Sequence, residues 1–292
     1  MKVTTIKTVT ALMLTPLTLT ALFSSSFCSA HSRYILPSHT LLSSNKSESV
    51  SMTASISNDL FHPDMPLGDN GKGVVPEGFQ PLFNSLQSIL VLPNGKQVAG
   101  PSWQSFSRFS VADQLVGQDG TYRIILKQPK TLMTTYRDQE GIPGRQFGPN
   151  PTLPKNATHI NRLAIHSSVE TYISKNEPTG APFTPLGKGL ELNGDSHPND
   201  LFVGEPVTFS LTYNGKPLTE SIEIQLIPED TRHRNQREII QVHTDVKGYF
   251  KVSFKEAGFY LLEAELAIPA DDQSDIDQSI YTLYVTLEVF PE

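Results

Sequence analysis

Histidine is the residue type in this sequence that is best suited to hold a ligand. Imidazole nitrogen is a preferred ligand of nickel, cobalt and copper ions, so a histidine site is the first chemistry to consider. No two of the histidines have the spacing of ligands on one helical turn, so the fold must bring any such site together. The chain of 292 residues contains eight of them: His31, His39, His62, His159, His166, His197, His233 and His243.

His31 differs from the other histidines because an export signal is predicted to end just before it. Two lysines precede an apolar run over residues 10–23, and the small residues Cys-Ser-Ala at 28–30 suit a signal peptidase. The apolar run is shorter than the ~20 residues of a membrane-spanning helix. We therefore predict a signal peptide at residues 1–30, export to the periplasm and a mature chain that begins at His31.

Signal cleavage gives His31 a free α-amine beside its imidazole. An amine and a ring nitrogen on one residue can chelate a divalent metal, and further histidines could complete a brace around it. His62 lies in a Phe-His-Pro-Asp loop and His197 in a Ser-His-Pro-Asn-Asp turn. The predicted metal ligands are His31, His39, His62 and His197, and the predicted ion is nickel, cobalt or copper. For His62, a surface turn without a metal is the competing interpretation.

The single cysteine and the charge balance exclude several classes of protein. Cys28 lies in the predicted signal, so the mature chain has neither a disulfide nor a thiol ligand. Removal of Lys2 and Lys7 reduces the 23 basic residues to 21 against 30 acidic ones, which takes the formal charge from −7 to −9. An excess of negative charge argues against nucleic acid and anionic membrane surfaces. We expect no nucleic-acid partner and no direct membrane insertion.

The sequence lacks the common catalytic motifs. It has no G-x-S-x-G nucleophile elbow, no H-E-x-x-H zinc motif, no P-loop and no dinucleotide fingerprint. No two carboxylates stand out as an acid and base pair. We therefore predict that the protein is not an enzyme, with an envelope hydrolase as the least favoured alternative.

Short β-rich runs, roughly ten residues apart, must position these side chains. The alternating run VTFSLTY at residues 207–213 precedes Asn214-Gly215, a pair typical of tight hairpins. Long helical periodicity is almost absent, so the predicted fold class is all-β, with two immunoglobulin-like or prealbumin-like β-sandwich domains. Strands are expected at residues 49–57, 88–92, 108–111, 121–128, 132–137 and 163–173, then at 207–213, 222–227, 238–244, 249–254, 259–266 and 279–290.

A segment rich in proline and glycine at residues 177–185 is the predicted joint between the two domains. We therefore expect an N-terminal β domain at residues 31–188 and a C-terminal immunoglobulin-like sandwich at residues 189–292. Leu201 and Phe202 directly follow a Pro-Asn-Asp turn, so both are expected to be buried at the start of a strand.

Three segments resemble a bacterial envelope family. AHSRYILPS at residues 30–38 is similar to that family's Ala-His-x-x-(Trp/Tyr)-(Ile/Leu)-x-Pro mature start. GLELNGDSHPNDLFVGE at residues 189–205 is similar to its segment with Leu, Pro and Gly-(Glu/Asp) at fixed spacing. NGKPL at residues 214–218, with the later segments 244–248 and 258–260, follows its strand-turn pattern. The family is carried as a domain of unknown function and is associated with the periplasmic part of nickel or cobalt uptake.

The resemblance implies two β domains and metal handling. Residues 156–175 lack the Tyr-x-x-x-Ala-Lys stretch of many relatives, so no ligand is carried over from there. Our leading interpretation is a periplasmic metal-binding protein of nickel, cobalt or copper uptake or handling, whose partner is an envelope transporter or receptor. The alternative is a structural or interaction β-sandwich module of the cell envelope that binds no small ligand.

Overall fold

The computed structural model describes residues 31–68, 86–229, 238–271 and 274–292, so the predicted signal peptide at residues 1–30 lies outside the described residues. Apart from one 3₁₀ turn, η1 (Ala181–Phe183), their regular structure is all β. These residues include no helix with the length and hydropathy needed to cross a bilayer.

The strands of the first half are β1 (Ser32–Pro37), β2 (Leu41–Leu42), β3 (Glu48–Ser57), β4 (Met65–Pro66), β5 (Gln87–Val91), β6 (Gln97–Ala99), β7 (Gln104–Ser105), β8 (Ser110–Val116), β9 (Gly120–Arg137), β10 (Pro143–Phe147) and β11 (Thr158–Lys175). Those of the second half are β12 (Leu190–Gly194), β13 (Pro206–Tyr213), β14 (Lys216–Pro217), β15 (Glu223–Pro228), β16 (Ile240–His243), β17 (Tyr249–Ser253), β18 (Gly258–Pro269) and β19 (Gln278–Val289).

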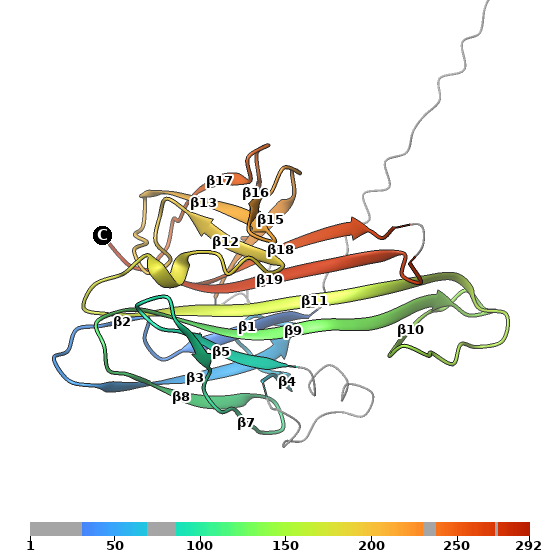
Figure 1. Ribbon diagram of the computed structural model, residues 1–292, viewed down its shortest axis with the longest axis horizontal. Coiled ribbons are helices and arrows are strands. Elements are labelled where there is room, and N and C mark those ends of the chain that lie inside the picture. The colour runs from blue at the N-terminus through green and yellow to red at the C-terminus, as the bar shows by residue number, and fades with distance from the viewer. Residues whose placement is uncertain (1–30, 69–85, 230–237, 272–273) are drawn as a thin grey trace, which may run out of the picture. The chain divides into compact units, whose positions relative to one another are not determined.

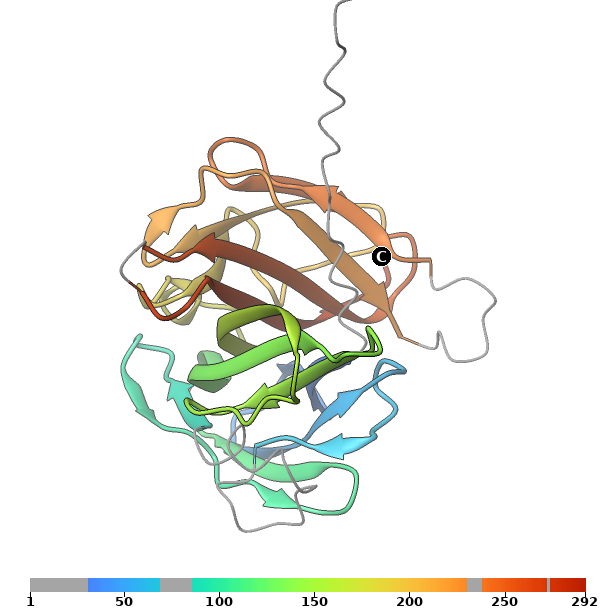
Figure 2. The same ribbon diagram turned by 90° about the vertical axis from the view of Figure 1, so that its right-hand side faces the viewer.

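A ten-stranded sheet in the order β16-β15-β18-β19-β11-β9-β5-β6 is the central layer, with β10 paired to β9 and β2 to β11. One smaller sheet contains β1-β3-β8-β7, with β4 on β3. The other contains β12-β13-β14, with β17 on β13. Figure 1 shows the long strands β9, β11, β18 and β19 between these two smaller sheets, and Figure 2 shows the same layering after a turn of 90°.

The two faces of the central sheet form separate hydrophobic cores. Successive side chains of a strand point to opposite faces, so neighbours on one strand enter different cores. Leu261 and Tyr284 join the first core with β1, β3 and β8, whereas Leu262 and Leu283 join the second core with β12, β13 and β17. The prediction of an all-β fold with two sandwiches is confirmed.

Strands from both halves of the chain meet inside the central sheet. β11 pairs in parallel with β19, from Leu163 with Gln278 to Thr171 with Thr286. By backbone contacts, residues 31–292 form one compact unit. The predicted domain boundary between residues 188 and 189 does not divide this unit, so it stays a prediction. It does lie directly before β12, the first strand of the second sandwich.

Most expected strands occur within one or two residues of their predicted bounds, and three differences matter for the candidate sites. The runs at 121–128 and 132–137 are one strand, β9, with a register shift opposite His166. β1 occupies the start of the mature chain, where no strand was predicted, and β12 lies directly after the predicted joint. The hairpin after β13 is as expected, with φ of 50° at Asn214 and 75° at Gly215.

A buried cluster of charges connects the central sheet to β12. Arg123 of β9 places Nη2 2.8 Å from Glu170 Oε2 of β11 and 3.5 Å from Glu191 Oε1 of β12, and all three side chains are at most 3% exposed. Arg123 Nε also donates to Glu170 Oε2 at 2.8 Å. Burial opposes the charge of Arg123, but attraction to the two carboxylates raises its pKa above the usual value.

The two carboxylates are also hydrogen-bonded on their other sides. Ser168 Oγ donates to Glu170 Oε1 at 2.7 Å. Glu191 accepts the backbone N–H groups of Leu186, Gly187 and Lys188 at 2.8, 2.7 and 3.0 Å. The cluster therefore fixes β9, β11, β12 and the loop that leads into β12.

Replacement of Arg123 should destabilise the fold strongly. Arg123→Met leaves two buried carboxylates without their counter-charge, which should lower the free energy of unfolding by about 3–5 kcal/mol. Urea denaturation measures the change, with Arg137→Met at the exposed end of β9 as a control expected within about 0.5 kcal/mol of wild type. A loss below about 1 kcal/mol for Arg123→Met would show that the cluster does not constrain the fold.

Leu201 provides a test of the second core. Its side chain is 0% exposed, as predicted. The prediction that Phe202 is buried at a strand start is wrong: it is half-buried, because it lies at an isolated parallel bridge with Phe290 outside any strand. Leu201→Ala should reduce stability by about 2–5 kcal/mol through lost contacts and a residual cavity. Leu115→Ala, at a side chain 60% exposed, is the matched control. Equal denaturation midpoints of the two variants would contradict the assignment.

Candidate metal site

His31 lies at the end of the first small sheet. β1 runs antiparallel to β3, and its first residue Ser32 pairs with Ser57, the last residue of β3. One residue further back, His31 stands opposite Asn58. The predicted mature terminus is therefore next to the loop of residues 58–64, which connects β3 to β4.

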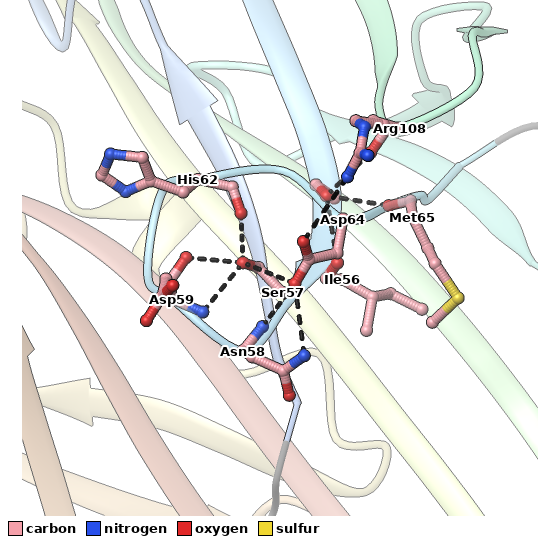
Figure 3. A network of polar contacts seen from close by, with 9 residues as sticks. Ile56, Ser57, Asn58, Asp59, His62, Asp64, Met65 and Arg108 are labelled. Carbon is pink, nitrogen blue, oxygen red and sulfur yellow. Dashed lines mark hydrogen bonds and ion pairs between the residues drawn. The ribbon is translucent and has the colours of Figure 1, made fainter. Parts of the chain in front are cut away.

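Polar contacts hold this loop in shape (Figure 3). Asp64 Oδ2 accepts the backbone N–H of Asn58 at 3.0 Å and its side-chain amide at 3.3 Å. Arg108 Nη1 lies 3.8 Å from Asp64 Oδ1, in an exposed ion pair of little energetic weight. The Ser57 hydroxyl contacts the carbonyl oxygens of Asp59 and His62. Asp64 and Ser57 therefore fix the path of the backbone.

Phe61 adds a packing constraint just before His62. Its φ is +60°, a value that is strained for a bulky side chain and persists only where the surroundings enforce it. The ring packs edge-to-face on Tyr34 at 5.0 Å and on Phe259 at 6.2 Å between centroids. These contacts compensate for the strained backbone and fix the position from which His62 projects.

Within the described part of the chain, the ring of His62 has one defined hydrogen bond. Its Nδ1 lies 3.1 Å from the carbonyl oxygen of Leu60, which can only accept a hydrogen bond. Nδ1 therefore carries the proton and Nε2 keeps its lone pair. A backbone carbonyl that orients a histidine in this way is a common outer partner in metal sites.

His39 lies at the opposite end of β1 from His31. The intervening strand has six residues, which separates the two histidines by about 20 Å at ~3.3 Å per residue. His39 is exposed and its Nδ1 contacts only the neighbouring Ser38 hydroxyl, at 3.1 Å, within the described residues. The structure therefore does not bring His31 and His39 together.

His197 is occupied by hydrogen bonds that support the fold. Its Nδ1 accepts the backbone N–H of Asn199 at 3.0 Å, so Nε2 carries the proton and lies 3.2 Å from both Thr179 O and Thr121 Oγ1. Burial lowers the pKa of His197, against weaker opposing effects of the Thr179 carbonyl and Asp200. The buried Asn199 extends the network to β11 through the backbone oxygen of Tyr172, at 3.1 Å.

The four predicted ligands therefore do not form one cluster. His31 and His62 belong to one end of the first sandwich, whereas His39 lies at the other end of β1. Across residues 31–68, 86–229, 238–271 and 274–292, no three histidine, aspartate, glutamate or cysteine side chains are grouped as a metal site. Only His31 and His62 share one end of the sandwich, where β1 and β4 lie on opposite sides of β3. A metal site there needs the α-amine to supply another donor.

The sequence analysis did not predict a hollow in the surface around His166, which is separate from the candidate metal site. It is lined by three lysines, Lys127, Lys130 and Lys188, and by Tyr281. About sixty residues separate the first two lysines from the third, and no motif connects them. A signal was present only in Pro129, since proline inside a strand pattern indicates a bulge.

The hydrogen bonds of His197 predict a pH-dependent stability. Its pKa is below 6.5 in the folded state, so the unfolded chain takes up this proton first as the pH falls. The stabilising contribution of the neutral His197 ring is complete above about pH 6.5. It is lost as the pH falls toward the pKa of His197 in the folded state. His197→Ala should lower the free energy of unfolding by about 1–3 kcal/mol at pH 7.5. Between pH 7.5 and 5.5, the free energy of unfolding of this variant should decrease less than that of the wild type.

Denaturant titrations at the two pH values measure this difference. His243→Ala removes an exposed histidine from β16 and should keep both the wild-type stability and its pH dependence. If His197→Ala keeps the full wild-type pH dependence, the imidazole is not held neutral by the network.

Comparisons with known structures give only distant similarities. The chain is similar to trypsin-activated alpha-2-macroglobulin from Escherichia coli, at 12% identity and a TM-score of 0.23, over 90% of this chain and 16% of that one. The elastase-activated alpha-2-macroglobulin from Escherichia coli is 11% identical with a TM-score of 0.22, over 88% of this chain and 31% of that one. The two tandem V-type regions of VCBP3, a v-region-containing chitin-binding protein, are 9% identical with a TM-score of 0.18, over 87% of this chain and 98% of that one. The chain thus spans about a sixth and a third of the two macroglobulin chains.

The family model gives a clearer result. No curated protein matches the chain. The model for a domain of unknown function, DUF4198, matches residues 28–268, which include the predicted mature start and most of both sandwiches. This agrees with the resemblance to a family of unknown function, whereas the expected association with nickel or cobalt uptake is not part of the family's description. The chain belongs to the DUF4198 family.

Proposed function

We propose that the protein is exported to the periplasm and binds nickel, cobalt or copper through the α-amine and imidazole of His31. The observation that carries the proposal is the pairing of Ser32 with Ser57, which fixes the predicted terminus beside the loop of residues 58–64. Strand pairing on one side of His31 and a constrained loop on the other reduce the ordering cost of binding.

The donor types at this end of the first sandwich suit these metals. The amine and one ring nitrogen come from His31, and Nε2 of His62 offers a third nitrogen because Nδ1 is bonded to Leu60. A set of nitrogen donors favours copper and nickel, whereas calcium and magnesium prefer oxygen donors alone.

Few protein ligands suit a protein that passes its metal on. Two donors from His31 and one from the loop leave positions on the ion for water or for a partner's ligands. An envelope transporter or receptor could then take the metal by exchanging ligands one at a time. A closed four-ligand site would hold the ion structurally instead.

An interaction module without a small ligand is the second candidate. Its support is the outer part of β9, β10 and β11, where Ile142, in the turn before β10, is 60% exposed and Ile160 of β11 is 46% exposed. Large apolar side chains on such a surface suit contact with another protein. This role needs no metal, so metal binding distinguishes the two candidates.

Isothermal titration with nickel tests the free terminus as a ligand. The chain that begins at His31 is compared with the same chain carrying one extra glycine before His31. The extension replaces the amine by an amide and should weaken binding at least about tenfold, since loss of even an outer partner costs 10–100-fold. Affinity should also fall as the pH falls, because protons compete with the metal for the donor nitrogens.

Two histidine variants locate the remaining ligands. His62→Ala should weaken nickel binding, whereas His39→Ala, at the far end of β1, should leave it unchanged. Equal affinity of the extended and unextended chains would show that the amine is not a ligand. Absence of binding to both chains would leave the interaction module as the function.

A further inference from the structure

A groove on the second-core side of the central sheet carries three lysines in a protein of negative net charge. Its volume is about 300 Å³. We call it the lysine groove and define it by Lys127, Pro129, Lys130, His166, Lys188 and Tyr281. It lies apart from the His31 site, which is at the end of β1 and packs with the first core.

Paired aromatic rings line the groove. His166 of β11 and Tyr281 of β19 are directly paired across the parallel strands, and their rings stack at 4.4 Å with an angle of 9°. Tyr213 packs edge-to-face on Tyr281 at 5.0 Å. Burial, together with Lys130 and Lys127, lowers the pKa of His166, so its ring is neutral at pH 7. The lining therefore includes a stacked pair of rings that carries no charge.

A bulge in β9 brings two lysines to the same side. Thr131 pairs with Ile165 and Gln128 with Ser167, so Pro129 and Lys130 together oppose the single residue His166. An extra residue in one strand breaks the alternation of side chains and re-aims them. Lys130, which regular alternation would turn away from Lys127, thus lines the same hollow.

The loop that carries the third lysine is held in place from several directions. Glu191 binds the backbone N–H groups of residues 186–188, and Lys127 Nζ donates to the carbonyl oxygen of Lys188 at 2.7 Å. Gly189 donates its N–H to Asn214 Oδ1 at 2.8 Å and accepts the N–H of Asn214 at 2.9 Å. Lys188 is therefore presented by a fixed backbone.

The charges around the groove leave an excess of positive charge. None of the three lysines forms an ion pair with a carboxylate within the described part of the chain. The charged groups directly behind are Arg123, Glu170 and Glu191. Four cations therefore face two carboxylates, and two positive charges remain. Burial lowers the pKa of Lys127, while Glu170 and Glu191 oppose that shift.

We propose that the lysine groove binds a small multivalent oxyanion, a phosphate or a polycarboxylate, through Lys127, Lys130 and Lys188. The excess of two positive charges matches a dianion or trianion, and the volume admits a molecule of that size. The stacked rings of Tyr281 and the neutral His166 line the same groove without adding charge. This site is independent of metal binding at His31.

Titration calorimetry of the mature chain with inorganic phosphate, citrate and acetate tests the proposal. The experiment uses metal-free buffer at constant ionic strength, so its result does not depend on the metal site. Phosphate or citrate should bind clearly more tightly than acetate, and the tighter of the two identifies the ligand class. Acetate that binds as tightly as both would overturn the proposal.

Paired lysine variants locate the site. The double variant Lys130→Gln and Lys188→Gln should weaken binding of the preferred anion by about tenfold or more for each lost charge-assisted hydrogen bond. The control is Lys96→Gln with Lys247→Gln, which removes the same charge from exposed turns and should bind like wild type. Thermal melting checks that both double variants are folded. Equal affinity of the two would overturn the assignment.

A spectroscopic measurement provides independent support. The ring C–H resonances of His166 should shift when the preferred anion is added, while those of His243 on β16 should not. Unchanged His166 resonances at saturation would place the bound anion elsewhere and overturn the proposal.

Discussion

The buried guanidinium of Arg123 is the constraint on which much of this structure depends. A charge with no exposed surface must have its counter-charges beside it, and here these come from two further strands. A buried ion cluster is weak evidence for added stability, because desolvation offsets much of the attraction. Its effect is on geometry: Arg123, Glu170 and Glu191 are all satisfied only when β9, β11 and β12 are in place together. The second sandwich is thus docked on the sheet of the first.

The same cluster shapes the surface beside it. Glu191 uses its oxygens for both Arg123 and the backbone of residues 186–188, so the loop next to the lysine groove is held by a group buried in the fold. The charge cluster that joins the two sandwiches therefore also fixes one wall of the groove. His31, in contrast, is positioned by strand pairing in the first sandwich alone. The two candidate sites have different structural origins and can change independently.

Local signals predicted the strands well because alternation and tight turns are encoded by neighbouring residues. Asn214-Gly215 and the run before it are examples. Partners distant in sequence could not be predicted in this way. Glu191 is a charged residue in a short polar run after a predicted joint. It is buried because Arg123, 68 positions earlier, and three loop N–H groups partner its oxygens. His197 has the sequence context of a ligand, yet Asn199, Thr179 and Thr121 occupy its nitrogens.

In the proposed metal site, the fold positions His31 and export turns it into a chelating ligand. An amide nitrogen gives its lone pair to the carbonyl group through resonance, so it is a poor metal ligand until the peptide bond is cut. The pairing of β1 with β3 begins at Ser32, one residue after the predicted terminus. The uncleaved chain can therefore form the same sheet end and the same constrained loop without the chelating amine. Metal capture would then be controlled by one covalent step in the right compartment, with no rearrangement of the fold.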